Sequence, residues 1–238
     1  MPSRNTIAVL KSPKSDDKAE VPGAQQYLPE DRGLSSLKHA ASDCRGCTLF
    51  EDATQTVFGN GKPEAPLMLV GEQPGDREDL QGLPFVGPAG GLLMRALEEA
   101  GIDPALTYQT NAVKHFKFKQ VGKRRIHEKP GRIEVVACQP WLLAEIQSLQ
   151  PQVILCLGAT AAQSLLGNTF RVTAHRGETL RLPETLEFDL KPEPVVMATV
   201  HPSSLLRDRS DQRQQNFDRF VDDLRTAGAE VPGMFAHP

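Results

Sequence analysis

The chain has 238 residues, 39% of them hydrophobic, and a formal net charge of −3 at pH 7. These values are ordinary for a soluble globular protein with one domain, and they argue against a general polyanion binder of the histone kind. No apolar stretch approaches the roughly 20 residues needed to cross a bilayer, and the N-terminal sequence lacks the apolar core and cleavage site of a signal peptide. We therefore expect a monomeric cytoplasmic protein that does not bind membranes.

The N-terminal segment, residues 1–33, is polar, contains prolines and has little periodicity, which predicts a flexible tail. A short helix is expected over residues 35–43. From there on, compact apolar runs alternate with stretches of helical spacing, a pattern typical of an α/β domain with a mainly parallel sheet. We place this domain at residues 34–228 and a second tail at residues 229–238.

Three apolar runs are clear strand candidates: residues 66–70, 153–157 and 195–200. A further strand is expected just before Asn111. Apolar residues at helical spacing predict helices after the GPAGG segment, between residues 135 and 149, and around residues 217–224. Because the carboxyl ends of parallel strands meet at one edge of a sheet, we expect three loops to lie together there: GEQPG (71–75), LGAT (157–160) and HPSS (201–204).

The four cysteines form one close pair and two scattered positions. Cys44 and Cys47 make a C-x2-C pair, whereas Cys138 and Cys156 are separated by 17 residues. A zinc ribbon normally presents a second close pair, whereas this arrangement suits an iron–sulfur cluster held between separate elements. Taken singly, Cys138 and Cys156 are better explained as small core residues. Because no cysteine is left over, we predict a metal site built from all four, with zinc as the alternative that spacing leaves open.

The loop after the first strand carries polar and aromatic side chains. Its glycines do not follow the G-x-G-x-x-G order, so a dinucleotide site is rejected. The loop offers two carboxylates, Glu72 and Asp76, followed by Phe85 between Pro84 and Gly87, where the backbone can approach a ligand closely. A capped helix entry with a core phenylalanine would explain the same residues.

Two other loops and a basic run complete the candidate site. Asn111 and His201 follow strands, although an isolated histidine before a proline is more often a turn residue. Residues 114–129 contain five Lys and two Arg against one Glu, and include KRRIH at 123–127. Gly122 before KRRIH and a Pro-Gly pair after it predict a loop with defined ends. Such runs are most often solvated surface, and phosphate binding is the other interpretation.

Together these motifs resemble the uracil-DNA glycosylase superfamily, specifically its iron–sulfur branch, from about residue 37 to residue 228. The resemblance is carried by CRGC (44–47), TQTVFGNG (54–61), GEQPG (71–75), LPFVGPAGGLL (83–93), TNAVKH (110–115), the Cys138 and Cys156 pair, and HPSS (201–204). It implies a three-layer α/β/α sandwich with a central four-stranded parallel sheet, a [4Fe–4S] cluster held by Cys44, Cys47, Cys138 and Cys156, and removal of uracil from DNA. It also implies a place in the cytoplasm, at the nucleoid when bound to DNA.

The KRRIH segment is the mark of the UdgX subgroup, because ordinary iron–sulfur members have a shorter connection there. The resemblance implies that the protein excises uracil, mainly from single-stranded DNA, and that His127 then bonds to C1′ of the abasic sugar in a single turnover. Two alternatives stay open. One is a conventional iron–sulfur glycosylase that releases a free abasic site, and the other is a non-catalytic cluster-containing module that binds DNA.

The resemblance assigns roles that suit the residue types. His127 is the nucleophile, Glu72 the base, and His201 the donor to uracil O2, where negative charge grows as the bond breaks. Asn111 can donate to uracil O4 and accept from N3–H, whereas cytosine presents the reverse pattern. The other substrate-binding residues are Gly71, Gln73, Phe85 as stacking platform, and Arg125, which is expected to pair with Asp76 and pin the loop. Two free surface charges are the alternative for that pair.

Overall fold

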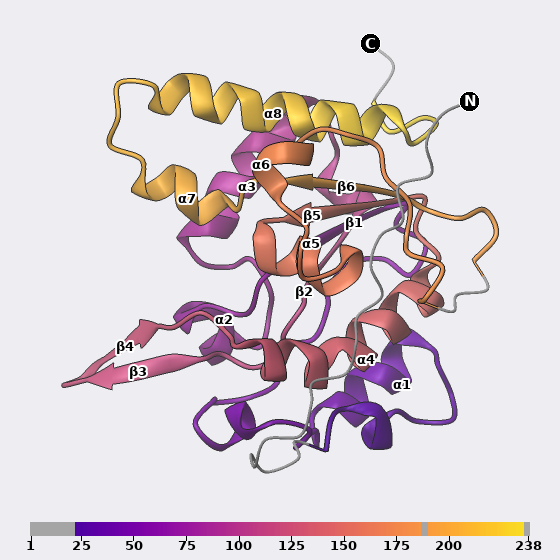
Figure 1. The fold of residues 1–238 in the computed structure, drawn as a ribbon, viewed down its shortest axis with the longest axis vertical. Helices are drawn as coiled ribbons and strands as arrows, with labels where there is room; N and C mark the ends of the chain where they lie inside the picture. The colour runs from indigo at the N-terminus through magenta and orange to yellow at the C-terminus, as the bar shows by residue number, and fades with distance from the viewer. Residues whose placement is uncertain (1–21, 187–189, 236–238) are drawn as a thin grey trace.

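The computed structural model describes residues 22–186 and 190–235. Its centre is a parallel four-stranded sheet in the order β2-β1-β5-β6 (Figure 1). The strands are β1 (Leu67–Gly71), β2 (Thr107–Asn111), β5 (Val153–Leu157) and β6 (Val195–Thr199). The predicted strands are therefore confirmed, with ends that differ by at most one residue. In the described ranges, every helix is too short or too polar to cross a bilayer.

Helices cover both faces of the sheet. Alternate strand residues point to opposite faces, so Leu67 and Leu69 belong to one core cluster, and Met68 and Val70 to another. The first face is covered by α3 (Pro88–Ala100), α7 (Pro202–Arg207) and α8 (Arg213–Ala229), and the second by α4 (Arg132–Leu149) and α5 (Ala159–Leu166). The predicted α/β/α sandwich is confirmed, and Figure 1 displays its three layers.

Shorter elements complete the described chain. They are η1 (Gln25–Tyr27), α1 (Leu34–Ala41), η2 (Thr48–Glu51), α2 (Asp76–Gln81), η3 (Pro104–Leu106) and α6 (Val172–His175). The helix expected over residues 35–43 is α1, which packs against α4. A third apolar cluster lies between these two helices and includes Trp141 of α4.

Both predicted tails are too long. Ala24 is buried, and its N–H donates to the carbonyl of Ala137 in α4 at 2.7 Å. The start of the described chain therefore belongs to the folded body, because the backbone of Ala24 bonds to α4. At the other end Val231 and Met234 are buried in the first core cluster. Residues 1–21 and 236–238 lie outside the described chain.

The basic run forms a β-hairpin instead of the predicted loop. β3 (Phe118–Val121) and β4 (Arg124–His127) pair antiparallel, joined by a two-residue turn in which Gly122 has φ 59°. Glycine adopts this left-handed conformation easily, which favours a tight hairpin. Figure 1 shows the hairpin extending away from the body beside α2. Because side chains alternate along a strand, Arg125 and His127 face the same side.

Candidate active site

Gly71, Phe85 and Asn111 meet at the carboxyl edge of the sheet. Gly71 ends β1 and is in register with Asn111, which ends β2. A side chain at position 71 would collide with Asn111 Oδ1 and would place its Cβ 2.8 Å from Phe85 Cζ. Asn111 and Phe85 are 3% and 8% exposed. The glycine therefore leaves room for a carboxamide and an aromatic ring to lie close together.

The backbone of Phe85 has an unusual conformation. Its φ is 56°, in the left-handed region that bulky residues rarely adopt. Gly90 of α3 lies against the Phe85 carbonyl, so that any side chain at position 90 would overlap it. Strain of this kind persists only where the surroundings fix it, and it is common at functional sites. The packing of α3 thus orients the Phe85 ring toward Gly71.

Glu78 joins the loops on either side of α2 and was missed by the sequence analysis. Its carboxylate accepts from Gly75 N–H and, at 3.4 Å, from Gly87 N–H. Burial raises the pKa of Glu78, and these N–H donors oppose that effect. A glutamate three residues after a helix N-cap is a capping signal that the sequence carries.

Glu72 and His127 face each other across the rim. Glu72 Oε1 lies 3.6 Å from His127 Nε2, and the other carboxylate oxygen accepts a hydrogen bond from the Thr160 hydroxyl of α5. The side chain of His127 is 49% exposed and that of Glu72 is 22% exposed. Thr160 therefore fixes a carboxylate whose free oxygen faces a solvent-accessible imidazole.

His201 is held as a neutral hydrogen-bond donor. It caps the N-terminus of α7, where its Nδ1 accepts from Ser203 N–H at 3.1 Å. In a neutral ring the proton is then on Nε2, which is free to donate. Burial lowers the pKa of His201 to about 4, with further contributions from His127 and Arg207. The Cβ of any residue replacing Gly158 would lie 3.0 Å from His201 Cβ, so the β5 loop also packs closely on this histidine.

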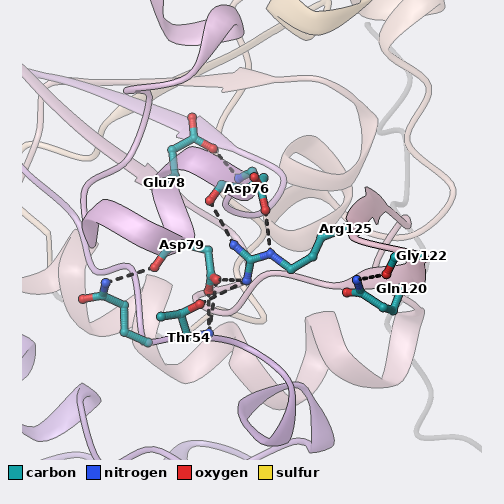
Figure 2. A network of polar contacts seen from close by, with 9 residues as sticks. Thr54, Asp76, Glu78, Asp79, Gln120, Gly122 and Arg125 are labelled. Carbon is teal, nitrogen blue, oxygen red and sulfur yellow. Dashed lines mark hydrogen bonds and ion pairs between the residues drawn. The ribbon is translucent and has the colours of Figure 1, made fainter.

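Arg125 anchors the hairpin to α2 (Figure 2). Its Nε donates to Asp76 Oδ1 at 2.6 Å, and its Nη1 donates to Asp79 Oδ2 at 2.6 Å and to Thr54 Oγ1 at 3.0 Å. The expected pairing with Asp76 is present. Asp79, which is fully buried and also accepts from Thr54 N–H at 3.0 Å, was missed, although residues three apart on a helix share a face.

Gln73 does not present its carboxamide to a ligand. Its Nε2 donates to the carbonyls of Lys117 at 3.1 Å and Glu128 at 2.9 Å, and its Oε1 accepts from Lys117 N–H at 3.1 Å. These two residues lie at the base of the hairpin, just outside β3 and β4. The polar atoms of the Gln73 side chain therefore close the hairpin base, and the expected substrate contact of Gln73 stays a prediction.

Three of the four cysteines lie together. Cys44, Cys47 and Cys138 belong to the cluster around Trp141. Trp141 Nε1 donates to Cys44 Sγ at 3.2 Å, and Lys114 N–H donates to Cys138 Sγ at 3.2 Å. Donors aimed at sulfur are the usual surroundings of thiolates that bind a cluster, so this set fits the predicted group. Burial raises the pKa of Cys47, and that of Cys138 to about 12.

Cys156 lies elsewhere, in the middle of the sheet. It is on β5, in register with Val70 and Ala198, and is fully buried in the second core cluster. Burial alone raises its pKa to about 12. The structure thus places Cys156 as a small core residue, the alternative that spacing left open. Among the described residues, no three His, Cys, Asp or Glu side chains converge as ligands of a single metal ion.

His115 is linked to the cysteine group and was missed. Its Nε2 lies 2.9 Å from Thr56 Oγ1, whose hydroxyl donates to the carbonyl of Ala41 at 2.9 Å. That carbonyl also accepts from Cys44 N–H at 3.1 Å. Burial lowers the pKa of His115 to about 4. The available signal was its position in the TNAVKH motif, from which the sequence analysis took only Asn111 as a site residue.

The Lys and Arg side chains of the basic run fall into two groups, those in ion pairs with the body and those that are exposed. Lys114, Lys117 and Arg125 form ion pairs with carboxylates of the body. The remaining cations are exposed: Lys119, Lys123, Arg124 and Lys129. Fewer groups are thus available for phosphates than the sequence suggested.

Comparisons with known proteins identify the family of this chain. Residues 58–225 match the family described as the uracil DNA glycosylase superfamily. A type-4 uracil-DNA glycosylase of Thermotoga maritima is 36% identical over 180 residues, which cover 75% of this chain and 86% of that protein. One of Sulfurisphaera tokodaii is 33% identical over 178 residues, covering 73% and 76%. With its whole four-stranded sheet and its strand-end loops inside the matched range, this chain belongs to the uracil-DNA glycosylase superfamily.

Proposed function

We propose that the protein excises uracil from DNA, mainly single-stranded, as a monomer, and that His127 then captures the abasic sugar covalently. One observation carries the second half of this proposal. His127 Nε2 faces the Glu72 carboxylate at 3.6 Å, at the same rim as Asn111 and His201. A nucleophile beside a carboxylate is the arrangement that covalent catalysis requires.

Recognition comes first, because uracil stacked in a duplex is out of reach. Extruding the nucleotide costs a few kcal/mol, and least in a single strand. The Phe85 ring supplies a stacking surface for the base. Asn111 donates to uracil O4 and accepts from N3–H, so that cytosine would leave buried groups unpaired.

The bond between C1′ and N1 then breaks, and its electron pair leaves with the base. The sugar becomes cationic and the uracil anionic. His201 Nε2–H donates to uracil O2 and stabilises the growing negative charge. Its lowered pKa suits this role, because a neutral imidazole remains available at pH 7. The Glu72 carboxylate supplies the negative charge that stabilises the cationic sugar.

Capture by the imidazole completes the reaction. A lone pair of the His127 ring forms the new bond to C1′, and the resulting imidazolium releases its remaining ring proton. Glu72 is the carboxylate beside the ring that accepts it, and the departing uracil anion takes up a proton in turn. The sugar-bound neutral imidazole is a poor leaving group. The enzyme is therefore consumed in a single turnover.

A [4Fe–4S] cluster is proposed at the cysteine group, with Cys44, Cys47 and Cys138 as ligands. Such a cluster would cross-link the C-x2-C loop to α4, and no step above requires an electron. Cys156 was the expected fourth ligand, but His115 is the better candidate, because imidazole replaces thiolate in some clusters. Iron analysis of the Cys156→Ser and His115→Ala variants separates the two candidates. Only replacement of the true ligand should lower the iron content and the visible absorption of the purified protein.

The proposal is tested on a denaturing gel with a single-stranded oligonucleotide that contains one uracil. The wild-type protein should give a shifted band that survives heat and detergent, in an amount that matches the uracil released. His127→Ser should lose the band yet release uracil, because water then has room to attack C1′. Glu72→Ala and Asn111→Ala should lower uracil release.

Two outcomes would favour the alternatives. Uracil release by the wild type without a shifted band would identify a conventional glycosylase, with the hairpin as a DNA-gripping element. Retention of DNA without any free uracil would identify a non-catalytic binding module.

A further inference from the structure

A fully buried ion pair lies behind β2, and the chemistry proposed above does not use it. Lys114 and Glu145 have side chains that are 1% and 0% exposed, and Lys114 Nζ contacts Glu145 Oε2. Glu145 also accepts from the hydroxyls of Tyr108 at 2.9 Å and Thr110 at 3.0 Å, and from Gly59 N–H at 3.1 Å. Replacing such a pair by apolar residues is often neutral or stabilising, so stability alone does not explain it.

The ammonium group of Lys114 reaches the base-recognition residue. Its Nζ donates to the carbonyl of Asn111 at 2.8 Å and to Thr110 Oγ1 at 2.6 Å, in addition to its contact with Glu145. An ammonium has three donors, and here each has an acceptor. The direction of the bond to the Asn111 carbonyl is therefore fixed.

The backbone of Lys114 is held equally firmly. Its N–H donates to Cys138 Sγ at 3.2 Å, and its carbonyl accepts from Val57 N–H at 2.8 Å. Lys114, which lies in the turn after β2, thus links Cys138 of α4 to Val57. A residue fixed at both its backbone and its side chain can serve as a rigid support for a neighbour.

We propose that Lys114 is a positioning residue for uracil recognition, holding the Asn111 peptide so that its carboxamide faces the base. This inference rests on the proposed role of Asn111. The Asn111 carboxamide and the Phe85 ring both lie against Gly71, so a small rotation of the Asn111 peptide would misalign the carboxamide. Misplacement of a recognition group by about 1 Å can lower a rate about 100-fold.

A double-mutant cycle tests the inference through the second-order rate constant of uracil release, measured under single-turnover conditions with enzyme in excess over DNA. Lys114→Met is expected to lower this value about 100-fold when Asn111 is present. In the Asn111→Ala background the same change should lower it less than about twofold, because the group that Lys114 positions is already gone. Equal losses in both backgrounds, or no loss in either, would overturn the proposal.

Two controls address charge and folding. Lys62→Met removes the same charge from an exposed position and should leave uracil release unchanged. Because Lys114→Met leaves Glu145 buried without its cation, the cycle is repeated with the Lys114→Met/Glu145→Gln pair, judged by the same criteria, with thermal melting as the check on folding. If Asn111→Ala alone has no effect, the proposed role of Asn111 fails as well. If Asn111→Ala matters and Lys114→Met does not, this inference alone fails.

Discussion

The strand-end group, made of Gly71, Phe85 and Asn111, and the β3–β4 hairpin hold their functional side chains by different means. In the strand-end group, Asn111 and Phe85 are buried and packed against Gly71, so that backbone geometry fixes them. On the hairpin, His127 is half-exposed, and its position depends on the anchor two residues earlier in β4, Arg125. The residues proposed for base excision and those proposed for sugar capture therefore rest on separate supports, which mutations can break one at a time.

The largest expected effect comes from adding a methyl group at position 71 in the strand-end group. Gly71→Ala should lower uracil release about 100-fold, because the new methyl group displaces Asn111 and Phe85 from their present contacts. The covalent band should fall in parallel, since capture requires the abasic sugar. Single-turnover release of free uracil measures the first effect, and the denaturing gel the second.

Gly91→Ala is the matched control for this change. A methyl group at position 91 meets no atom within 4 Å, and alanine stabilises a helix by up to about 1 kcal/mol relative to glycine. This variant should keep full activity and melt at an equal or higher temperature. If Gly91→Ala lost as much activity as Gly71→Ala, displacement of Asn111 and Phe85 would not be the cause of the loss in Gly71→Ala.

Breaking the hairpin anchor should have a smaller and more selective effect. Arg125→Met removes the fork to Asp76 and Asp79, so that His127 is presented less accurately. We expect the crosslinking rate to fall about tenfold and uracil release to change much less. Arg124→Met, on the opposite face of β4, removes the same charge as a control. Parallel loss of release and crosslinking in Arg125→Met would contradict the separation of the two regions.

The pH dependence of uracil release tests whether His201 is neutral. Burial lowers its pKa to about 4, so uracil release should persist below pH 6 and fall only as the pH approaches 4. His201→Asn should be slower and should lack this acid limb. Because the unfolded chain binds the same proton near pH 6.5, acidification from 6.5 to 4 should also lower the free energy of unfolding. An acid limb centred near pH 6.5 would show that His201 is not held neutral.

The smallest effect concerns phosphate contacts at the hairpin. For single strands, the logarithm of affinity falls with the logarithm of salt concentration by about 0.7 per neutralised phosphate. Lys123→Ala should reduce that slope by about this amount, measured with uracil-free DNA. Lys117→Ala should leave the slope unchanged, because Lys117 already pairs with Glu134 at 2.9 Å. Equal changes in both variants would mean that the body-paired cations also contact phosphates.

The sheet was predictable from the sequence, whereas the hairpin was not. The two inner strands, β1 and β5, are apolar runs buried along their whole length. The strands of the hairpin are short and mostly polar, and what orders them is the distant contact of Arg125 with Asp79. Local pattern carries no information about such a partner.

The spacing of the cysteines in the sequence also could not show which of them lie together in the structure. Cys138 and Cys156 both fall on apolar faces of their elements, and only the three-dimensional packing separates them into different clusters. Similarly, Gln73 was assigned to the substrate because of its motif, yet its amide is engaged by the hairpin base. A motif identifies which loop is involved in function, and side-chain direction is set by long-range contacts.

The covalent capture is tested most directly by mass spectrometry of the protein after incubation with uracil-containing single-stranded DNA. Nuclease and protease digestion should leave one modified peptide, carrying a deoxyribose-phosphate remnant on His127. A remnant on another residue, or none in a sample that has released uracil, would contradict the account.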